Sequence, residues 1–126
     1  MIKENYPARE KLKQKRLIDL LFAKGKWQTC GSLRIITLNL EAKPQEGFSV
    51  PIQKVGVSAP KRNFKKAVDR NRIKRLLREA YRKNKIIFEE TFGAQSLSML
   101  FWVSKEKPAG YAEVEKHLLD LCKSKK

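Results

Sequence analysis

Residues 66–84 read KAVDRNRIKRLLREAYRKN and form the most strongly patterned stretch of the sequence. Apolar side chains recur there at the i, i+3, i+4, i+7, i+8 spacing that defines one helix face: Ile73, Leu76, Leu77, Ala80 and Tyr81. At 100° per residue, the opposite face collects polar and cationic side chains: Asn71, Arg75, Arg78 and Arg82. We therefore predict a helix that packs one face on a core and presents a row of cations on the other.

The segments on either side of this helix carry further helix and strand patterns. Helical spacing appears in residues 10–23 and 111–123. Apolar runs that alternate or are rich in β-branched residues predict strands at residues 33–40, 54–59 and 97–104, with a short further candidate at 27–30. Residues 41–47 and 91–96 are predicted loops. The predicted order is α-β-β-β-α-β-α, an α+β fold (an α/β sandwich) with a small central sheet. We expect one domain over residues 1–126, with flexible ends at residues 1–9 and 124–126.

The chain is strongly basic. It has 126 residues, with 29 Lys and Arg against 13 Asp and Glu, so its formal net charge is +16. Between residues 61 and 85, 12 basic residues are opposed only by Asp69 and Glu79. Such an excess predicts a polyanionic partner. RNA, DNA and an anionic membrane surface all fit the charge alone.

The arrangement of the charges narrows this choice to nucleic acid. A solubilising helix face usually mixes cations with acids, whereas cations placed close together on a helix repel one another. A membrane-surface helix needs a free apolar face, but so short a chain needs its single apolar stripe for the core. Arginine offers a planar fork that binds phosphates and stacks on bases. We therefore favour a nucleic-acid partner and expect no membrane partner.

The sequence contains no residue group suited to self-contained catalysis or metal binding. Its acidic residues are dispersed and His117 is the only histidine, so neither a carboxylate metal site nor a histidine pair is predicted. No glycine-rich phosphate loop is present, and Cys30 and Cys122 have no Cys or His close by in the sequence. We expect no catalytic residue and no metal ligand. The lack of a secretory pattern or a long apolar run predicts a reduced, soluble, cytoplasmic protein.

One string is specific enough to suggest a family. AVDRNRIKRLLRE, at residues 67–79, resembles the signature of the bacterial ribonuclease P protein component, whose core is Arg70-Asn71-Arg72 in this sequence. The preceding VGVSAPKR at residues 55–62 resembles the third strand of that family and the basic segment after it.

The resemblance extends over residues 10–124. Three shorter stretches match in kind and spacing: KLK at residues 11–13, FAKGK at residues 22–26 and KP at residues 107–108. The sequence departs from the family at Ile18, where many members have an aromatic residue, and at Pro60, where a polar or basic residue is common. The stretch 86–96 is also longer than usual.

The resemblance implies both a fold and a function. The motif helix would make a left-handed crossover between two parallel strands of an α-β-β-β-α-β-α fold. The protein would be the accessory subunit of an endoribonuclease, ribonuclease P, and would bind ribonuclease P RNA and precursor tRNA. The RNA subunit would hold the Mg²⁺ and cut the 5′ leader from the precursor, leaving the mature tRNA 5′ end. The protein itself would bind no cofactor and would require no protein partner.

Two binding surfaces follow from the same resemblance. The motif helix and its entry loop would bind the catalytic RNA, through Lys61, Arg62, Lys65, Lys66, Arg70, Asn71, Arg72, Lys74, Arg75 and Arg78. The other face of the sheet, beside the first helix, would hold the single-stranded leader, through Phe22, Arg34, Ile36 and Ser58. Arg70 has an alternative role as a brace within the fold, and Phe22 one as a core residue. Trp27 is a weaker candidate for the leader surface.

Two other functions stay open on the sequence. A ribosomal or other structural RNA-binding protein would share the charge and the lack of catalytic groups. A nuclease that acts without RNA would have to bring dispersed acids together, such as Asp19, Asp69, Glu79 and Glu113. Only such a nuclease would stay active after removal of all RNA.

Overall fold

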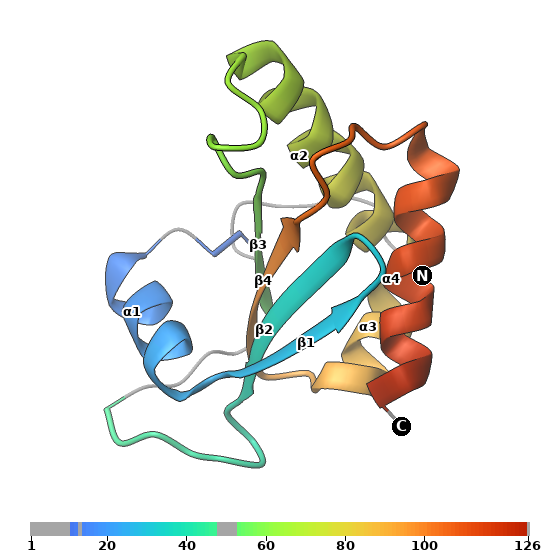
Figure 1. The fold of residues 1–126 in the computed structure, drawn as a ribbon. Coiled ribbons are helices and arrows are strands. Elements are labelled where there is room, and N and C mark those ends of the chain that lie inside the picture. Colours follow the sequence, from blue (N-terminus) through green and yellow to red (C-terminus); the bar gives the residue numbers. More distant parts are fainter. Residues whose placement is uncertain (1–10, 13, 48–52, 126) are drawn as a thin grey trace.

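The computed structural model describes residues 11–12, 14–47 and 53–125, and it has a four-stranded sheet with helices on both faces (Figure 1). Its elements are α1 (Lys15–Lys24), β1 (Lys26–Cys30), β2 (Leu33–Asn39), β3 (Lys54–Ser58), α2 (Ala67–Lys83), α3 (Lys85–Phe92), β4 (Ser96–Trp102) and α4 (Tyr111–Lys125). The strand order is β1-β2-β4-β3, in which β3 and β4 are parallel and the other neighbours antiparallel. The predicted α+β fold is confirmed, and each strand lies within two residues of its predicted position.

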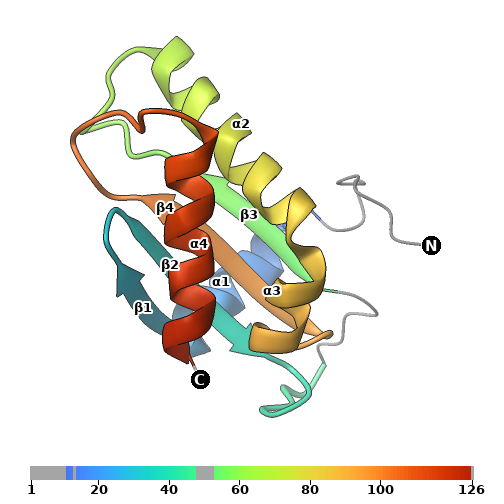
Figure 2. The same cartoon turned by 90° about the vertical axis from the view of Figure 1, so that its right-hand side faces the viewer.

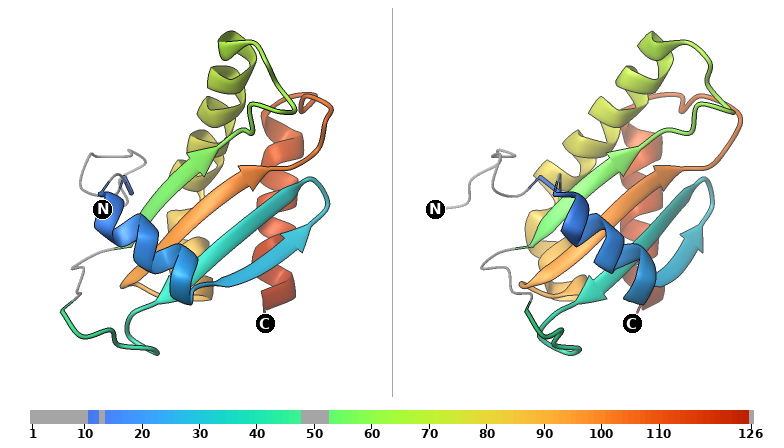
Figure 3. Two further views of the ribbon diagram at one scale, coloured as in Figure 1. Left: turned by 60° about the vertical axis from the view of Figure 1, so that its left-hand side comes forward. Right: turned by 90° about the vertical axis from the view of Figure 1, so that its left-hand side faces the viewer.

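The crossover connection from β3 to β4 is left-handed, which is the less common handedness. In the left view of Figure 3, α1 is in front of the sheet, and β4 lies to the right of β3 with both strands running upward. Helices α2 and α3, which connect these strands, lie behind the sheet. The crossover is therefore left-handed, as the family resemblance implied, whereas most such connections are right-handed.

The sheet separates two apolar cores. Helices α2, α3 and α4 cover one face, and α1 covers the other (Figure 2). The larger core, on the three-helix side, includes Ile35, Leu77 and Leu118, and the smaller core beneath α1 includes Leu21 and Ile36. Adjacent residues such as Ile35 and Ile36 enter different cores because successive strand side chains point to opposite faces.

Helix α3 was not predicted from the sequence. The stretch 86–96 was left without an element and residues 91–96 were assigned to a loop, whereas residues 85–92 form a helix that ends at Gly93. Phe88 and Phe92, spaced four residues apart, are buried in the larger core, with their ring centroids 4.7 Å apart. This pair was a helical signal, but the two exposed isoleucines directly before it, Ile86 and Ile87, obscured it. The element order is therefore α-β-β-β-α-α-β-α.

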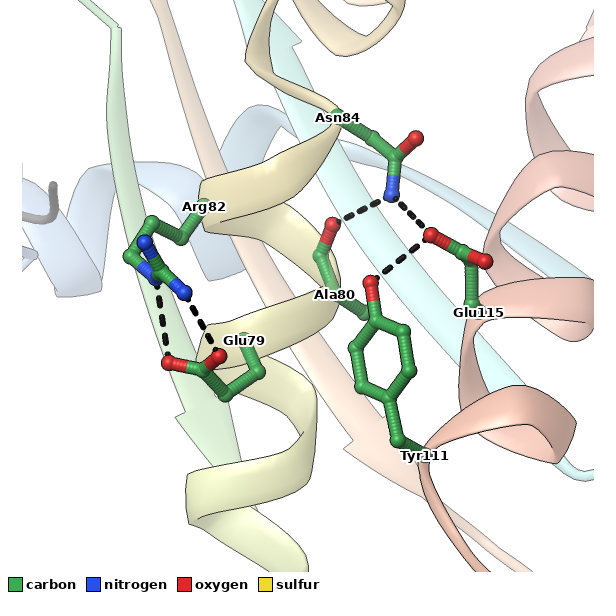
Figure 4. A network of polar contacts seen from close by, with 6 residues as sticks. All are labelled: Glu79, Ala80, Arg82, Asn84, Tyr111 and Glu115. Atoms are coloured by element: carbon green, nitrogen blue, oxygen red, sulfur yellow. Dashed lines mark hydrogen bonds and ion pairs between the residues drawn. The ribbon is translucent and has the colours of Figure 1, made fainter. Parts of the chain in front are cut away.

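A polar network joins the α2–α3 corner to α4 (Figure 4). The Asn84 side chain donates to the Ala80 carbonyl (2.8 Å) and to the Glu115 carboxylate (3.0 Å), which also accepts from the Tyr111 hydroxyl (2.7 Å). The bonds from Asn84 and Tyr111 hold the pKa of Glu115 below its usual value. Burial, followed by the bond to Glu115, raises the pKa of Tyr111 well above its usual value.

We expect Glu115→Gln to reduce the loss of stability in acid. Because the folded-state pKa of Glu115 is lowered, its charged form contributes stability above the unfolded-state pKa of about 4.3. This contribution is lost as the pH falls through the folded-state pKa. Urea unfolding at about pH 7 and about pH 3 should show a smaller difference in unfolding free energy for the variant than for the original protein. An equal reduction in the control Glu89→Gln, at an exposed position of α3, would contradict the assignment.

Helix α1 begins later than predicted. Residues 10–23 were expected to be helical, but Lys11 forms a parallel bridge with Val55 and the Leu12 amide donates to the Val55 carbonyl (3.1 Å). The segment therefore lies along the β3 edge before α1 starts at Lys15. Pairing with a sheet edge is a long-range interaction, so the local helical pattern could not reveal it.

Gly25 allows α1 to turn directly into β1. Its amide donates to the Leu21 carbonyl (2.7 Å), and a Cβ at this position would lie 2.5 Å from that oxygen and 2.7 Å from Ile36 Cγ1. We expect Gly25→Ala to lower the free energy of unfolding by about 1–3 kcal/mol, as overpacked sites do. Denaturant unfolding measures this, with Gly110→Ala as the control because no atom lies within 4 Å of a Cβ there. Equal losses for both variants would refute the steric explanation.

The predicted flexible N-terminus, residues 1–9, and residue 126 lie outside the described residues, and α4 continues to Lys125. Within the described ranges, no helix is both long enough and apolar enough to span a membrane.

Candidate nucleic-acid interface

A basic surface covers the exposed side of α2 and the turn that leads into it. The apolar stripe of α2 is used in the larger core, where Ile73, Leu77 and Tyr81 are fully buried. The predicted polar residues therefore lie on the solvent side: Lys61, Arg62, Lys65, Lys66, Asn71, Arg72, Arg75 and Arg78 are exposed, and Lys74 is partly exposed. We call these nine residues the basic surface. Among the described residues, Arg75 and Arg78 have no ion-pair or hydrogen-bond partner, so both guanidinium groups are available to phosphates.

Arg70 makes contacts that suit the alternative role of a brace. Its guanidinium donates to the carbonyls of Phe64 (2.8 Å) and Lys65 (2.9 Å), in the turn that carries the cations before α2. Phe64 is itself buried in the larger core. Arg70 thus fixes the position of Lys65 and Lys66 relative to the helix.

The basic surface is also tied to the loop between β4 and α4. Lys107 forms an ion pair with Asp69 (3.1 Å), and the Arg72 guanidinium reaches the Pro108 carbonyl (3.5 Å). The indole nitrogen of Trp102 donates to the Glu106 carbonyl (2.8 Å) and holds the loop against the sheet. The start of α2 is therefore positioned by loop contacts as well as by the core.

Arg82 is less available for binding than its position suggests. Its guanidinium makes two hydrogen bonds to Glu79, of 3.0 and 2.8 Å (Figure 4). These bonds, made by Arg82, hold the pKa of the Glu79 carboxyl below its usual value. The pair is close to neutral, so the row of free cations on α2 ends at Arg78.

A second candidate surface lies on the α1 side of the sheet. Phe22 of α1, Trp27 of β1 and Phe101 of β4 form an aromatic cluster, with ring centroids 5.5–6.2 Å apart. Phe22 and Trp27 are each 44% exposed. The Arg34 guanidinium carbon lies 4.1 Å from the Trp27 ring centroid. Exposed aromatic rings beside a cation are the groups that hold single-stranded nucleic acid by stacking and charge.

The strand register extends this surface across the sheet. Arg34 lies opposite Phe101, and Phe101 lies beside Ser58 in the parallel pair. Arg34 is exposed and Ser58 is partly exposed. The register thus brings two predicted leader residues into one row with Phe101, which the sequence reasoning missed. Alternation in β4 was the available signal, because it separates Phe101 from its buried neighbours Leu100 and Trp102.

The structure answers the questions about the other predicted leader residues. Phe22 is a member of the exposed aromatic cluster and not of the core, and Trp27, the weaker candidate, contacts both other rings. Ile36 is fully buried under α1 beside Gly25 and packs in the smaller core. We therefore remove Ile36 from the surface. Ile36 shares a strand face with Arg34, but α1 covers the Ile36 end of that face.

Three of the four acidic residues considered for an RNA-independent nuclease have separate partners. Asp69 pairs with Lys107, Glu79 with Arg82, and Glu113 accepts a hydrogen bond from the Ala109 amide (2.7 Å). In the part of the chain that the structure describes, no three His, Cys, Asp or Glu residues come together as a metal site. His117 stacks edge-on against Trp102, with a centroid distance of 5.7 Å, and covers Gly31.

Comparison with known proteins identifies the family and agrees with the fold. A family model described as Ribonuclease P matches residues 6–126. The ribonuclease P protein component of Porphyromonas gingivalis is 30% identical over 109 residues, which are 85% of this chain and 76% of that protein. The component from Nitrosococcus oceani is 38% identical over 52 residues, 41% of this chain and 40% of that protein.

Solved structures share the fold at lower identity. The RNase P protein of Thermotoga maritima has a TM-score of 0.69 at 22% identity, covering 91% of this chain and 96% of that one. The RNase P protein of Staphylococcus aureus has a TM-score of 0.68 at 19% identity, covering 93% of this chain and 95% of that one. On the family model and the Porphyromonas relative, the chain belongs to the Ribonuclease P protein family.

Proposed function

We propose that this protein is the protein subunit of ribonuclease P, which binds the catalytic RNA and the 5′ leader of precursor tRNA. The observation that carries the proposal is the basic surface, because it leaves cations exposed on a helix whose apolar stripe is used in the core. This arrangement suits an RNA backbone and leaves no apolar face for lipid. Family membership favours ribonuclease P RNA as the partner, because the relatives are ribonuclease P protein components.

The two surfaces have different tasks in this proposal. The basic surface binds phosphates of the catalytic RNA, and Arg70 supports it by holding the entry turn. The aromatic cluster, with Arg34 and Ser58, binds unpaired bases and phosphates of the leader. Helices α1 and α2 lie on opposite faces of the sheet (Figure 2), so one molecule can contact both RNAs at once.

The chemistry of cleavage belongs to the RNA in this proposal. The RNA subunit holds the Mg²⁺ that activates the attacking water, and the protein binds no cofactor and needs no protein partner. Its contribution is to hold the leader beside the catalytic RNA and to neutralise backbone charge. The complex works in the cytoplasm.

The test is cleavage of 5′-labelled precursor tRNA at low Mg²⁺ with protein alone, bacterial catalytic RNA alone, and both together. We expect cleavage at the mature 5′ end in the combined reaction only. Cleavage by protein stripped of RNA would show an active site in the protein and overturn the division of labour. A failure to stimulate any of several matched RNAs would favour a structural RNA-binding protein instead.

A further inference from the structure

Helix α2 carries two acidic side chains, and their partners differ. Glu79 pairs with Arg82, three residues further along the helix, at 2.8 Å. Asp69 precedes Arg72 by the same three residues, but its carboxylate pairs with Lys107 of the β4–α4 loop at 3.1 Å. The first pair cancels the charge of an arginine, whereas the second leaves Arg72 without a carboxylate partner among the described residues.

The spacing of Asp69 and Arg72 favours a pair between them. Side chains three residues apart on a helix are neighbours, and opposite charges at this spacing attract each other. The Glu79–Arg82 pair shows that α2 allows this geometry, with two hydrogen bonds of 3.0 and 2.8 Å. An Asp69–Arg72 pair would cancel the charge of Arg72 in the same way, and the basic surface would lose one available cation.

The β4–α4 loop gives each of these two residues a separate partner instead. Lys107 pairs with the Asp69 carboxylate, and the Pro108 carbonyl accepts a long hydrogen bond of 3.5 Å from one guanidinium nitrogen of Arg72. The loop lies beside the start of α2 (Figure 2). Because a guanidinium has several N–H donors and Arg72 is exposed, this one bond leaves the side chain able to bind a phosphate.

Asp69 has a structural reason to be present in spite of its charge. It lies in the first turn of α2, where the N-cap residue, Lys66, makes no side-chain capping bond. A negative charge in the first turn stabilises a helix through the helix dipole. The side chain of Lys107 is 56% exposed and that of Asp69 is 21% exposed. Solvent therefore screens their ion pair, and its contribution to the stability of the fold is small.

We propose that Lys107 is a positioning residue for RNA binding, which occupies Asp69 and so keeps the charge of Arg72 available to a phosphate. This inference rests on the proposed function, because it assigns a supporting residue to the surface that binds the catalytic RNA. Lys107 acts through Asp69 and not through a phosphate contact of its own. Loss of the Lys107 ammonium group should therefore weaken RNA binding only while Asp69 keeps its charge.

The test is filter binding of the full chain to bacterial ribonuclease P RNA over a range of salt concentrations. We expect Lys107→Gln to lower the slope of log K against log[salt] by about 0.5–1 unit and the affinity by roughly 3- to 10-fold. The reason is that Asp69 then pairs with Arg72. Adding Asp69→Asn to this variant should restore both values. In an Arg72→Ala background, Lys107→Gln should lower the slope no further.

Two single variants separate this role from others. Asp69→Asn alone should bind the RNA at least as tightly as the original protein. A purely structural role of the ion pair predicts equal losses for Asp69→Asn and Lys107→Gln, and that result would overturn the proposal. Lys105→Gln removes an exposed lysine of the same loop that has no carboxylate partner among the described residues. It should lower the slope less than half as much as Lys107→Gln, and an equal effect would contradict the role of the pair.

The remaining outcomes distinguish this inference from the proposed function. If Asp69→Asn fails to rescue Lys107→Gln, Lys107 contacts the RNA directly and is not a positioning residue. If Arg75→Ala lowers the slope and Lys107→Gln does not, this inference alone is wrong. If neither variant lowers the slope, the basic surface does not bind the RNA, and the proposed function fails together with this inference. Urea unfolding of each variant shows that it is folded.

Discussion

Replacing Arg75 and Arg78 together with alanine is expected to weaken binding to the catalytic RNA by roughly 10- to 100-fold at physiological salt. Each arginine contacts about one phosphate in the proposed complex, so the slope of log K against log[salt] should fall by about two units. Both side chains are exposed, and the core residues of α2 are untouched. The free energy of unfolding should therefore stay within about 0.5 kcal/mol of the original.

A matched control lies on the same helix face. Arg82 carries the same side chain, but its guanidinium is held by Glu79 at 2.8 Å. Arg82→Ala should lower the salt slope much less than either Arg75→Ala or Arg78→Ala. Filter binding over a range of salt concentrations measures all three slopes. If replacing Arg75 and Arg78 does not change the slope of log K against log[salt], α2 does not form the interface with the catalytic RNA.

The second large effect is expected at the aromatic cluster. Phe22→Ala combined with Trp27→Ala should lower affinity for precursor tRNA, in complex with the catalytic RNA, by roughly 10- to 100-fold, because each stacked base contributes about 1–3 kcal/mol. Affinity for mature tRNA, which lacks the leader, should change by less than about twofold. The measurement is the ratio of the two dissociation constants.

The control for exposed apolar area is Ile86→Ala combined with Ile87→Ala. These side chains are 49% and 42% exposed on α3, on the three-helix side of the sheet. The ratio should stay unchanged in this variant. Arg34→Ala and Ser58→Ala should also affect precursor more than mature tRNA, although less than the double aromatic variant. If all of these variants lose affinity for precursor and mature tRNA equally, the leader does not bind this surface.

The sequence predicted the elements whose pattern is local. Helix α2 carries two faces of opposite chemistry within one 19-residue string, and both faces lie in the structure as the 100° spacing requires. Helix α3 was missed because its core contact comes from only two rings, and its ends depend on contacts made elsewhere. Asn84 bonds to Glu115 on α4, and Gly93 packs against Asn39 on β2.

The candidate site was predicted in part for the same reason. All nine residues of the basic surface were named from the sequence: the five on α2 lie where the period of one helix places them, and the four in the turn before it came from the family resemblance. The leader surface needs the register of four strands and the position of α1 over them. Phe101 joins it because β4 lies between β2 and β3, and Ile36 leaves it because α1 covers its end of the strand.

The sequence by itself therefore determined the net charge, the two-faced helix and the family string, because each depends on residues close together in the chain. Only the tertiary structure showed the contacts of Arg70 with the entry turn and brought the aromatic cluster together. Each of these joins segments that are separated along the chain or depends on the backbone path between them. Whether such segments meet depends on the packing free energy of the whole fold, which cannot be predicted from the local spacing of residues.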